Sequence, residues 1–172
     1  TLGYYFYRAG GSRQDELFNP FDQASTRQYF GDYLTAKPWC EARRKISRPE
    51  VANIDTLVGI DDAHPVIVLH PNERILAHTH EFIGILPPGT TSMQARSTTG
   101  RIGISACYCA GWGDPGYINR WTMEIHNLNE YSYVVLPIGY RIAQIVFSAT
   151  GPVATEYARA SGNYQSNISD DL

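Results

Sequence analysis

The sequence has few cysteines, no long apolar run and little net charge. Its three cysteines are an odd set without the spacing of a disulfide framework, which favours reduced thiols in a cytoplasmic protein. No apolar run approaches the roughly 18 residues of a membrane helix, and no signal-peptide pattern opens the chain, so we expect no membrane partner. A formal net charge of -3 gives no general attraction to nucleic acid. Any anion site must therefore be local.

The sequence also lacks the usual signatures of metal-dependent chemistry. A zinc nucleobase deaminase would need H-x-E together with P-C-x-x-C, and neither pattern is present. His78 and His80 would face the same side of a strand, but Glu81 would point to the opposite side. Arg141 stands where a cupin-like site would need a further histidine. We therefore interpret both histidines as structural and predict that the protein supplies no metal ligands.

Thiol catalysis has little support in the sequence. Cys107 and Cys109 belong to the apolar run "GISACYC", where they would share one face of a strand. A nucleophilic cysteine needs a group that favours its thiolate, and no cation is adjacent in sequence.

What is present is a globular composition with a strand pattern. Hydrophobic residues make up 43% and charged residues 18%, as expected for a single globular domain that spans residues 1–172. After residue 50, short apolar runs rich in Val, Ile, Tyr and Thr alternate with turn signals such as Pro-Pro-Gly and Asp-Pro-Gly. Their regular spacing predicts an all-β sandwich or barrel. The runs cover residues 65–70, 74–86, 103–109, 121–127, 131–136 and 140–148.

Two segments depart from this pattern. Residues 22–46 indicate a helical excursion from the sheet, in which Asp22 or Ser25 could cap a short helix before Pro38 interrupts it. The polar, Gly- and Ser-rich residues 158–172 form either a frayed, flexible tail or a flap that orders over a ligand. The residues alone leave these alternatives open.

The stretch "ARSTTGR", residues 95–101, places two arginines around three hydroxyl side chains. Guanidinium groups and hydroxyls both donate hydrogen bonds to phosphate oxygens, so the stretch is a candidate polyphosphate clamp. The alternative is a solvated strand end, and the stretch itself does not decide between them.

Two carboxylates nearby have different expected roles. Asp114 lies in a Gly-Asp-Pro-Gly turn, where a carboxylate commonly forms the turn. Glu124 lies inside the run "WTMEIHN", with Met123 and Ile125 on the opposite face. A carboxylate inside a sheet is costly unless it is paired or functional. Glu124 is therefore either part of a solvated strand face or a buried group that serves as an acid or base.

Four segments that follow one another at close spacing resemble the dCTP deaminase branch of the dUTPase superfamily: "ARSTTGRIGIS", "AGWGDPGY", "MEIHN" and "PIGYRIAQIVF". The similarity runs from about residue 74 to 165 and includes "LAHTHEF", which matches a strand of that family. The resemblance implies a distorted jelly-roll β-barrel with a short helical insertion, assembled as a homotrimer with active sites at subunit interfaces. It also implies metal-independent deamination of dCTP to dUTP, with Mg2+ arriving on the substrate triphosphate.

The resemblance also implies roles for individual residues. Glu124 corresponds to the family's catalytic glutamate, which takes a proton from water, while Arg101 and Ser97 stabilise the adjacent charge and position the water. Asp114 would bond the 3'-hydroxyl, and Tyr117 would lie against the sugar where a 2'-hydroxyl has no room. The other residues implied for substrate binding are Arg96, Thr98, Ala110, Gly111, Gln144, Tyr157, Tyr164 and Gln165.

The chain departs from the family pattern at several positions. Thr98 replaces a serine but keeps the hydroxyl, Gly113 replaces an apolar residue, and Asn163 stands where the family has a lysine. Gly111 replaces the histidine typical of many enzymes that only deaminate, so the chain is more similar to bifunctional enzymes that continue to dUMP and pyrophosphate. The alternatives are a dUTPase only, whose Gly-rich C-terminal phosphate loop is missing here, and a non-catalytic deoxynucleotide-binding homologue, which the lost lysine would suit.

Overall fold

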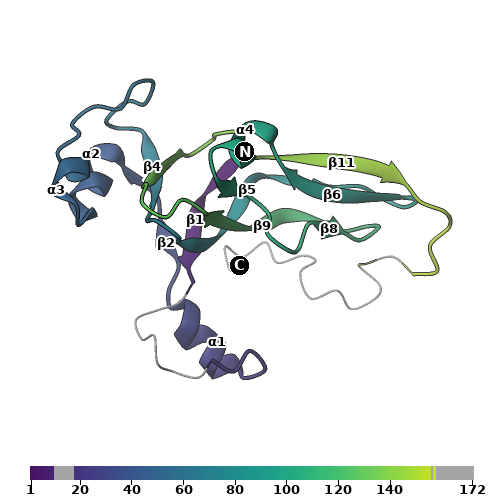
Figure 1. Ribbon diagram of the computed structural model, residues 1–172. Coiled ribbons are helices and arrows are strands. Elements are labelled where there is room, and N and C mark those ends of the chain that lie inside the picture. The colour runs from purple at the N-terminus through teal and green to yellow at the C-terminus, as the bar shows by residue number, and fades with distance from the viewer. Residues whose placement is uncertain (10–17, 156, 158–172) are drawn as a thin grey trace.

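The computed structural model describes residues 1–9, 18–155 and 157, and in this part of the chain three antiparallel sheets form the body of the molecule (Figure 1). The largest sheet has the strand order β2-β1-β5-β9-β7, and the smaller ones have the orders β10-β4-β3 and β11-β6-β8. The strands are β1 (Leu2–Arg8), β2 (Leu34–Thr35), β3 (Lys37–Pro38), β4 (Pro65–Leu69), β5 (Arg74–Gly84), β6 (Gly89–Ala95), β7 (Ile104–Ser105), β8 (Trp112–Gly113), β9 (Ile118–Asn127), β10 (Val134–Pro137) and β11 (Ala143–Ala149). The prediction of an all-β fold is confirmed.

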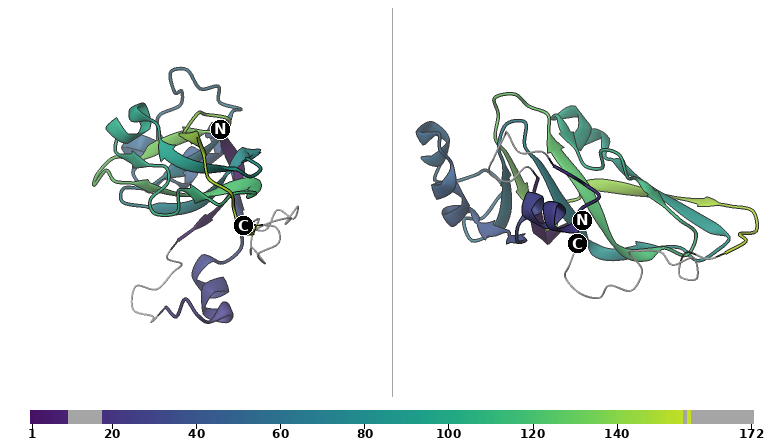
Figure 2. Two further views of the ribbon diagram at one scale, coloured as in Figure 1. Left: turned by 90° about the vertical axis from the view of Figure 1, so that its right-hand side faces the viewer. Right: turned by 90° about the horizontal axis from the view of Figure 1, so that it is seen from below.

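Short helices lie at the margins of these sheets. They are α1 (Gln23–Phe30), α2 (Trp39–Ala42), the 3-10 helix η1 (Arg43–Lys45), α3 (Pro49–Ala52) and α4 (Ser97–Arg101). In Figure 1, α1 lies apart from the sheets, while α2 and α3 lie beside β4. The right view of Figure 2 shows that the β6–β11 pair extends away from α2 and α3. Among the described residues, no helix combines the length and apolar character needed to cross a bilayer.

The helical excursion is present, with a different end from the predicted one. Asp22 is the N-cap of α1, because its carboxylate accepts hydrogen bonds from the backbone N–H groups of Ala24 and Ser25. The helix ends at Gly31, whose φ of 63° lies in the region that favours glycine, and not at Pro38. That residues 1–172 form a single domain stays a prediction. The predicted flexible tail, residues 158–172, lies outside the described residues.

Buried and partly exposed side chains alternate along β9, and the buried ones form part of the hydrophobic core. Met123 and Ile125 are fully buried, as is Ile75 opposite Ile125 on β5. This spacing follows from the two-residue period of a strand, in which neighbouring side chains point to opposite faces. Glu124 therefore lies on the face of β9 that points away from the core.

His78 packs inside the largest sheet. It is 4% exposed, its Nδ1 lies 2.7 Å from the Thr79 carbonyl oxygen, and its Nε2 accepts a hydrogen bond from the Tyr5 backbone N–H. The imidazole also stacks on the Tyr5 ring.

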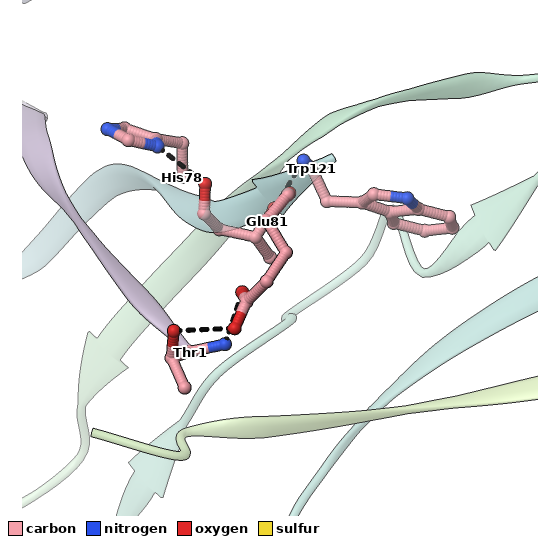
Figure 3. A network of polar contacts seen from close by, with 5 residues as sticks. Thr1, His78, Glu81 and Trp121 are labelled. Atoms are coloured by element: carbon pink, nitrogen blue, oxygen red, sulfur yellow. Dashed lines mark hydrogen bonds and ion pairs between the residues drawn. The ribbon is translucent and has the colours of Figure 1, made fainter. Parts of the chain in front are cut away.

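A bulge in β5 follows His78 and changes the pairing with β9. The register shifts between His78 and Phe82, and the Trp121 backbone N–H donates to the Thr79 hydroxyl. Figure 3 shows Glu81 reaching from the same place to Thr1, whose hydroxyl donates to its carboxylate. Glu81 is thereby occupied in joining β5 to the first strand.

Candidate active site

Glu124 has one carboxylate oxygen held and the other open. It is half-buried on the face of β9 opposite the core. Its Oε2 accepts hydrogen bonds from the backbone N–H groups of Cys109, at 2.7 Å, and Ala110, at 3.3 Å. Within the described residues, Oε1 has no hydrogen-bond partner. The arrangement orients a carboxylate while leaving one oxygen available to a water molecule or a ligand.

The donors to Glu124 come from a loop and not from the predicted strand. The run 103–109 forms a strand only over Ile104–Ser105, and residues 106–111 then pass alongside β9 as a loop. The prediction that Cys107 and Cys109 share one face of a strand is therefore wrong, since Cys107 is half-buried and Cys109 is exposed. Burial, and then the charge of Glu124, raises the pKa of Cys107 to about 11. The thiol is consequently protonated at neutral pH, in line with the prediction against thiol catalysis.

Gly111 sits where the loop touches β6. Its carbonyl accepts a hydrogen bond of 2.7 Å from the Met93 backbone N–H. A Cβ atom at this position would lie 2.6 Å from the Met93 carbonyl oxygen, too close for a real contact. Any larger residue here would push the loop away from β6 and from Glu124.

The stretch "ARSTTGR" is a helical turn and not a strand end. Arg96 has an extended backbone and precedes α4, and its Nη1 donates to the Arg141 carbonyl oxygen at 2.8 Å. The side chain of Thr99 is buried and anchors the turn, while Ser97 and Arg101 are exposed. Thr98 is exposed as well. The turn thus presents two hydroxyls and a guanidinium group on one short surface segment.

Asp114 and Tyr117 lie at the Asp-Pro-Gly turn before β9. Asp114 is exposed and accepts a hydrogen bond from the Trp112 indole at 3.2 Å, and its carbonyl accepts one from the Tyr117 N–H. The Tyr117 ring meets the rings of Trp121 and Tyr157 edge-on, with centroids 5.4 and 5.3 Å away. The aromatic ring beside the turn is therefore held in a fixed position.

The backbone of Tyr157 also contacts this turn. The Tyr157 N–H donates to the Pro115 carbonyl oxygen at 3.1 Å. Residue 157 is thus placed at the turn by both its backbone and its ring.

Trp121 also explains a departure from the family pattern. A Cβ atom at Gly113 would lie 2.5 Å from the Trp121 ring and 2.2 Å from the Thr91 hydroxyl oxygen. Only glycine leaves room for both neighbours, so an apolar side chain before Asp114 is not compatible with this packing.

The single chain does not bring all of the predicted site residues together. Within the described residues, neither Glu124 nor Asp114 makes a hydrogen bond or ion pair with Ser97 or Arg101. Gln144 is exposed on β11, opposite Gln94 of β6. Tyr164 and Gln165 lie outside the described residues.

Several neighbours of the site were missed by sequence reasoning. The backbone N–H groups of Cys109 and Met93 and the indole of Trp112 all contact predicted site residues. Backbone groups have no signature in a sequence, because every residue except proline carries the same donor and acceptor. Trp112 could have been noticed, since a tryptophan two residues before Asp114 is within reach of its carboxylate.

Comparison with known proteins shows the family. A family model described as dCTP deaminase-like matches residues 34–150. A protein of Methanopyrus kandleri named "dCTP deaminase, dUMP-forming" is 41% identical over 105 residues, which cover 60% of this chain and 54% of that protein. A protein of Methanosphaera stadtmanae with the same name is 29% identical over 131 residues, covering 76% and 64%. A further relative with this name, from Methanothermobacter thermautotrophicus, is 37% identical over 95 residues. The matched residues cover 54% of the M. kandleri protein and 48% of the M. thermautotrophicus protein, so the chain spans about half the length of these curated relatives.

A solved structure agrees on the fold. The crystal structure of 2'-deoxycytidine 5'-triphosphate deaminase from Agrobacterium tumefaciens aligns with 91% of this chain and 40% of its own, with a TM-score of 0.52 and 16% identity. At this identity the likeness concerns the fold alone. The match of the family model over residues 34–150, more than half of the chain, establishes that the chain belongs to the dCTP deaminase-like family.

Proposed function

We propose that the protein deaminates dCTP and continues to dUMP, with Glu124 as the group that transfers the proton. In the first step, water adds to C4 of cytosine and ammonia leaves, which gives dUTP. In the second step, water attacks the α-phosphorus and pyrophosphate leaves. The observation that carries this proposal is the Glu124 carboxylate, with Oε2 held by two backbone donors and Oε1 free among the described residues.

The geometry of Glu124 suits proton transfer. A general base must be within hydrogen-bond reach of the proton that it removes, and its orientation must be fixed. The N–H groups of Cys109 and Ala110 fix Oε2, so Oε1 is the atom we assign to the attacking water. The proton taken from water then passes to the base or to the leaving ammonia. Atoms and charge balance without a further reagent.

We infer that the site is completed by a second copy of the chain in a homotrimer. Ser97 and Arg101 are exposed on α4 and, among the described residues, make no hydrogen bond or ion pair with Glu124 of their own chain, yet the proposed chemistry needs them beside the reacting base. Large apolar side chains are exposed around the candidate site, including Ile102 at 50%, Tyr108 at 57% and Trp112 at 63%. Exposed apolar surface of this kind is typical of protein interfaces. In this arrangement α4 of one copy faces Glu124 of the next.

The remaining predicted site residues are assigned to the substrate's triphosphate and sugar. Arg96, Thr98 and Gln144 are assigned to the triphosphate and its surroundings, and Asp114 to the 3'-hydroxyl. Mg2+ would bind through triphosphate oxygens, where it neutralises charge, since Mg2+ usually keeps several waters and takes few protein ligands. The chain's own cations, Arg96 and Arg101, would supply the remaining counter-charge.

The assignment of dUMP as the end product rests on Gly111 and on the relatives. The two relatives described above are named as dUMP-forming enzymes. Gly111 has no room for a side chain beside the Met93 carbonyl, so the histidine of many enzymes that only deaminate does not fit here. This favours the bifunctional reaction.

One incubation separates the proposal from its alternatives. The protein is mixed with dCTP and Mg2+, and dCTP, dUTP, dUMP and ammonia are resolved over time. We expect equal amounts of dUMP and ammonia. Accumulation of dUTP would restrict the activity to deamination. Conversion of added dUTP without ammonia release from dCTP would make the protein a dUTPase, and binding of dCTP without any product would make it a non-catalytic homologue.

A further inference from the structure

A cavity lies away from the candidate active site, between β1, β4 and the segment that contains β2, β3 and η1. It has a volume of about 340 Å³ and shares no lining residue with the predicted active site. This volume falls at the lower end of the range for small-molecule pockets, roughly 300–1,000 Å³. In Figure 1 these elements lie on the side of the molecule where α2 and α3 are found.

The cavity concentrates positive charge in an acidic protein. Arg8, Lys37, Lys45 and His70 all line it, and no Asp or Glu does, although the chain carries a formal net charge of -3. Local concentration of one sign attracts an oppositely charged ligand. The pattern therefore points to an anion.

The two lysines are the cations available to a ligand. Arg8 is already paired with Glu73, and its Nη2 also donates to the Val68 carbonyl oxygen. Lys37 and Lys45 are exposed, and neither has an acidic partner among the described residues. They approach the cavity from two different elements, β3 and η1.

The pKa of His70 depends on the charge in this cavity. Burial, and then the positive charge of Arg8, lowers the pKa of His70 below its ordinary value. Its ring rests against Tyr133 and its backbone N–H donates to Glu73, so its position is fixed. An anion placed beside it would favour the protonated form and raise this pKa.

The walls of the cavity are apolar and aromatic. Phe6, Val66 and Val68 are buried behind it. Tyr33 is 46% exposed at its edge, and its ring contacts Tyr5 edge-on at 5.4 Å. A fixed, partly exposed ring beside cations suits a ligand with both a flat apolar part and an anionic part.

We propose that this cavity binds a phosphorylated aromatic small molecule, with Lys37 and Lys45 on the phosphate and the ring against Tyr33 and the apolar wall. The ligand is either a nucleoside monophosphate or an aryl phosphate, since both combine a flat ring with a phosphate. The inference does not depend on the proposed catalytic activity, because none of its residues belongs to that site.

The test is calorimetric titration of the full chain with phenyl phosphate, inorganic phosphate, phenol and uridine monophosphate as probes. We expect phenyl phosphate to bind one to one, and phosphate and phenol to bind at least about tenfold more weakly, because each offers half of the contacts. If uridine monophosphate binds more tightly than phenyl phosphate, the ligand class is nucleotide; if more weakly, it is an aryl phosphate.

The double substitution Lys37→Gln with Lys45→Gln should weaken phenyl phosphate binding at least about tenfold, since two charge-assisted hydrogen bonds are lost. Arg44→Gln is the matched control, because Arg44 lies beside Lys45 in η1 but does not line the cavity. Turnover of dCTP and the melting temperature should be unchanged in both variants. Proton NMR of His70 should show its pKa rising when phenyl phosphate binds.

Three outcomes would overturn the proposal. Absence of binding at millimolar phenyl phosphate would remove it directly. Equal affinity for inorganic phosphate would mean an adventitious ion only. Equal weakening in Arg44→Gln, or an unchanged pKa of His70 on binding, would place the ligand elsewhere.

Discussion

Glu124 is a carboxylate whose surroundings are set by backbone groups more than by side chains. Replacing it with Gln keeps the size and leaves an oxygen that can accept from Cys109 and Ala110, but removes the base. We predict that Glu124→Gln folds and binds dCTP, while ammonia release falls by at least roughly 10²–10⁴-fold, as expected for loss of a positioned general base. Steady-state ammonia release and a dCTP binding titration measure the two effects. Near-normal release would remove Glu124 from the proton transfer.

Tyr117 is the residue expected to select deoxyribose. Its ring is held edge-on by Trp121 and Tyr157, so it cannot move aside readily for a 2'-hydroxyl. A hydroxyl forced against the ring stays unpaired, at a cost of roughly 1–3 kcal/mol, so CTP should be turned over about tenfold or more less efficiently than dCTP. Tyr117→Ala should reduce this ratio of kcat/KM values, and Tyr117→Phe should preserve it. Equal use of CTP and dCTP by the unmodified protein would contradict this role.

The loop of residues 106–111 is the element that connects Glu124 to the rest of the fold. Burial and the charge of Glu124 raise the pKa of Cys107 to about 11, which is above its ordinary value. The folded state therefore binds this proton more tightly than the unfolded chain does, so the stabilisation is present at neutral pH and is lost as the pH rises toward 11. The reactivity of the Cys107 thiol therefore depends on whether the loop lies against β9.

We predict that iodoacetamide modifies the exposed Cys109 well before Cys107 at pH 8, because the thiolate is the reactive form. Glu124→Gln should shift the alkylation midpoint of Cys107 to lower pH, since a neighbouring negative charge is removed. Mass spectrometry of the alkylated peptides across a pH series gives both rates. If Cys107 reacts as fast as Cys109, the loop does not hold the position described here.

At the scale of the whole molecule, α4 and Glu124 share no hydrogen bond or ion pair among the described residues, which leads to the expectation of a homotrimer. Light scattering should give three times the 19.2 kDa mass of the chain at micromolar concentration. A fully active species with the mass of one chain would contradict a shared site.

A mixing experiment tests whether the site is shared between copies. Arg101→Ala and Glu124→Gln should each be inactive alone. When they are mixed and allowed to exchange subunits, some sites should combine an intact Arg101 from one copy with an intact Glu124 from another. Random exchange in a cyclic trimer restores roughly a quarter of the sites. If both residues act within one chain, mixing restores nothing.

Much of the fold could be predicted from residue order. The two-residue period placed Met123 and Ile125 on the face opposite Glu124, and Asp22, the N-cap of α1, was one of the two predicted caps. These features depend on neighbours within a few positions, where backbone geometry alone sets which way a side chain points. The motifs around residues 95–144 likewise identified the family before any distance was known.

Tertiary contacts decided the parts that depend on distant residues. The run 103–109 has strand composition, yet its second half is a loop because it packs beside Glu124 and β6 instead of pairing. The stretch "ARSTTGR" is a helical turn because Thr99 is buried beneath it. Glycine at position 113 follows from the ring of Trp121, eight positions away in sequence, and the cationic cavity joins residues from Phe6 to His70. The resemblance of short motifs identified the family, and the pattern of apolar runs indicated the strands. The surroundings of Glu124 and of the cationic cavity arise only when segments far apart in the chain pack together.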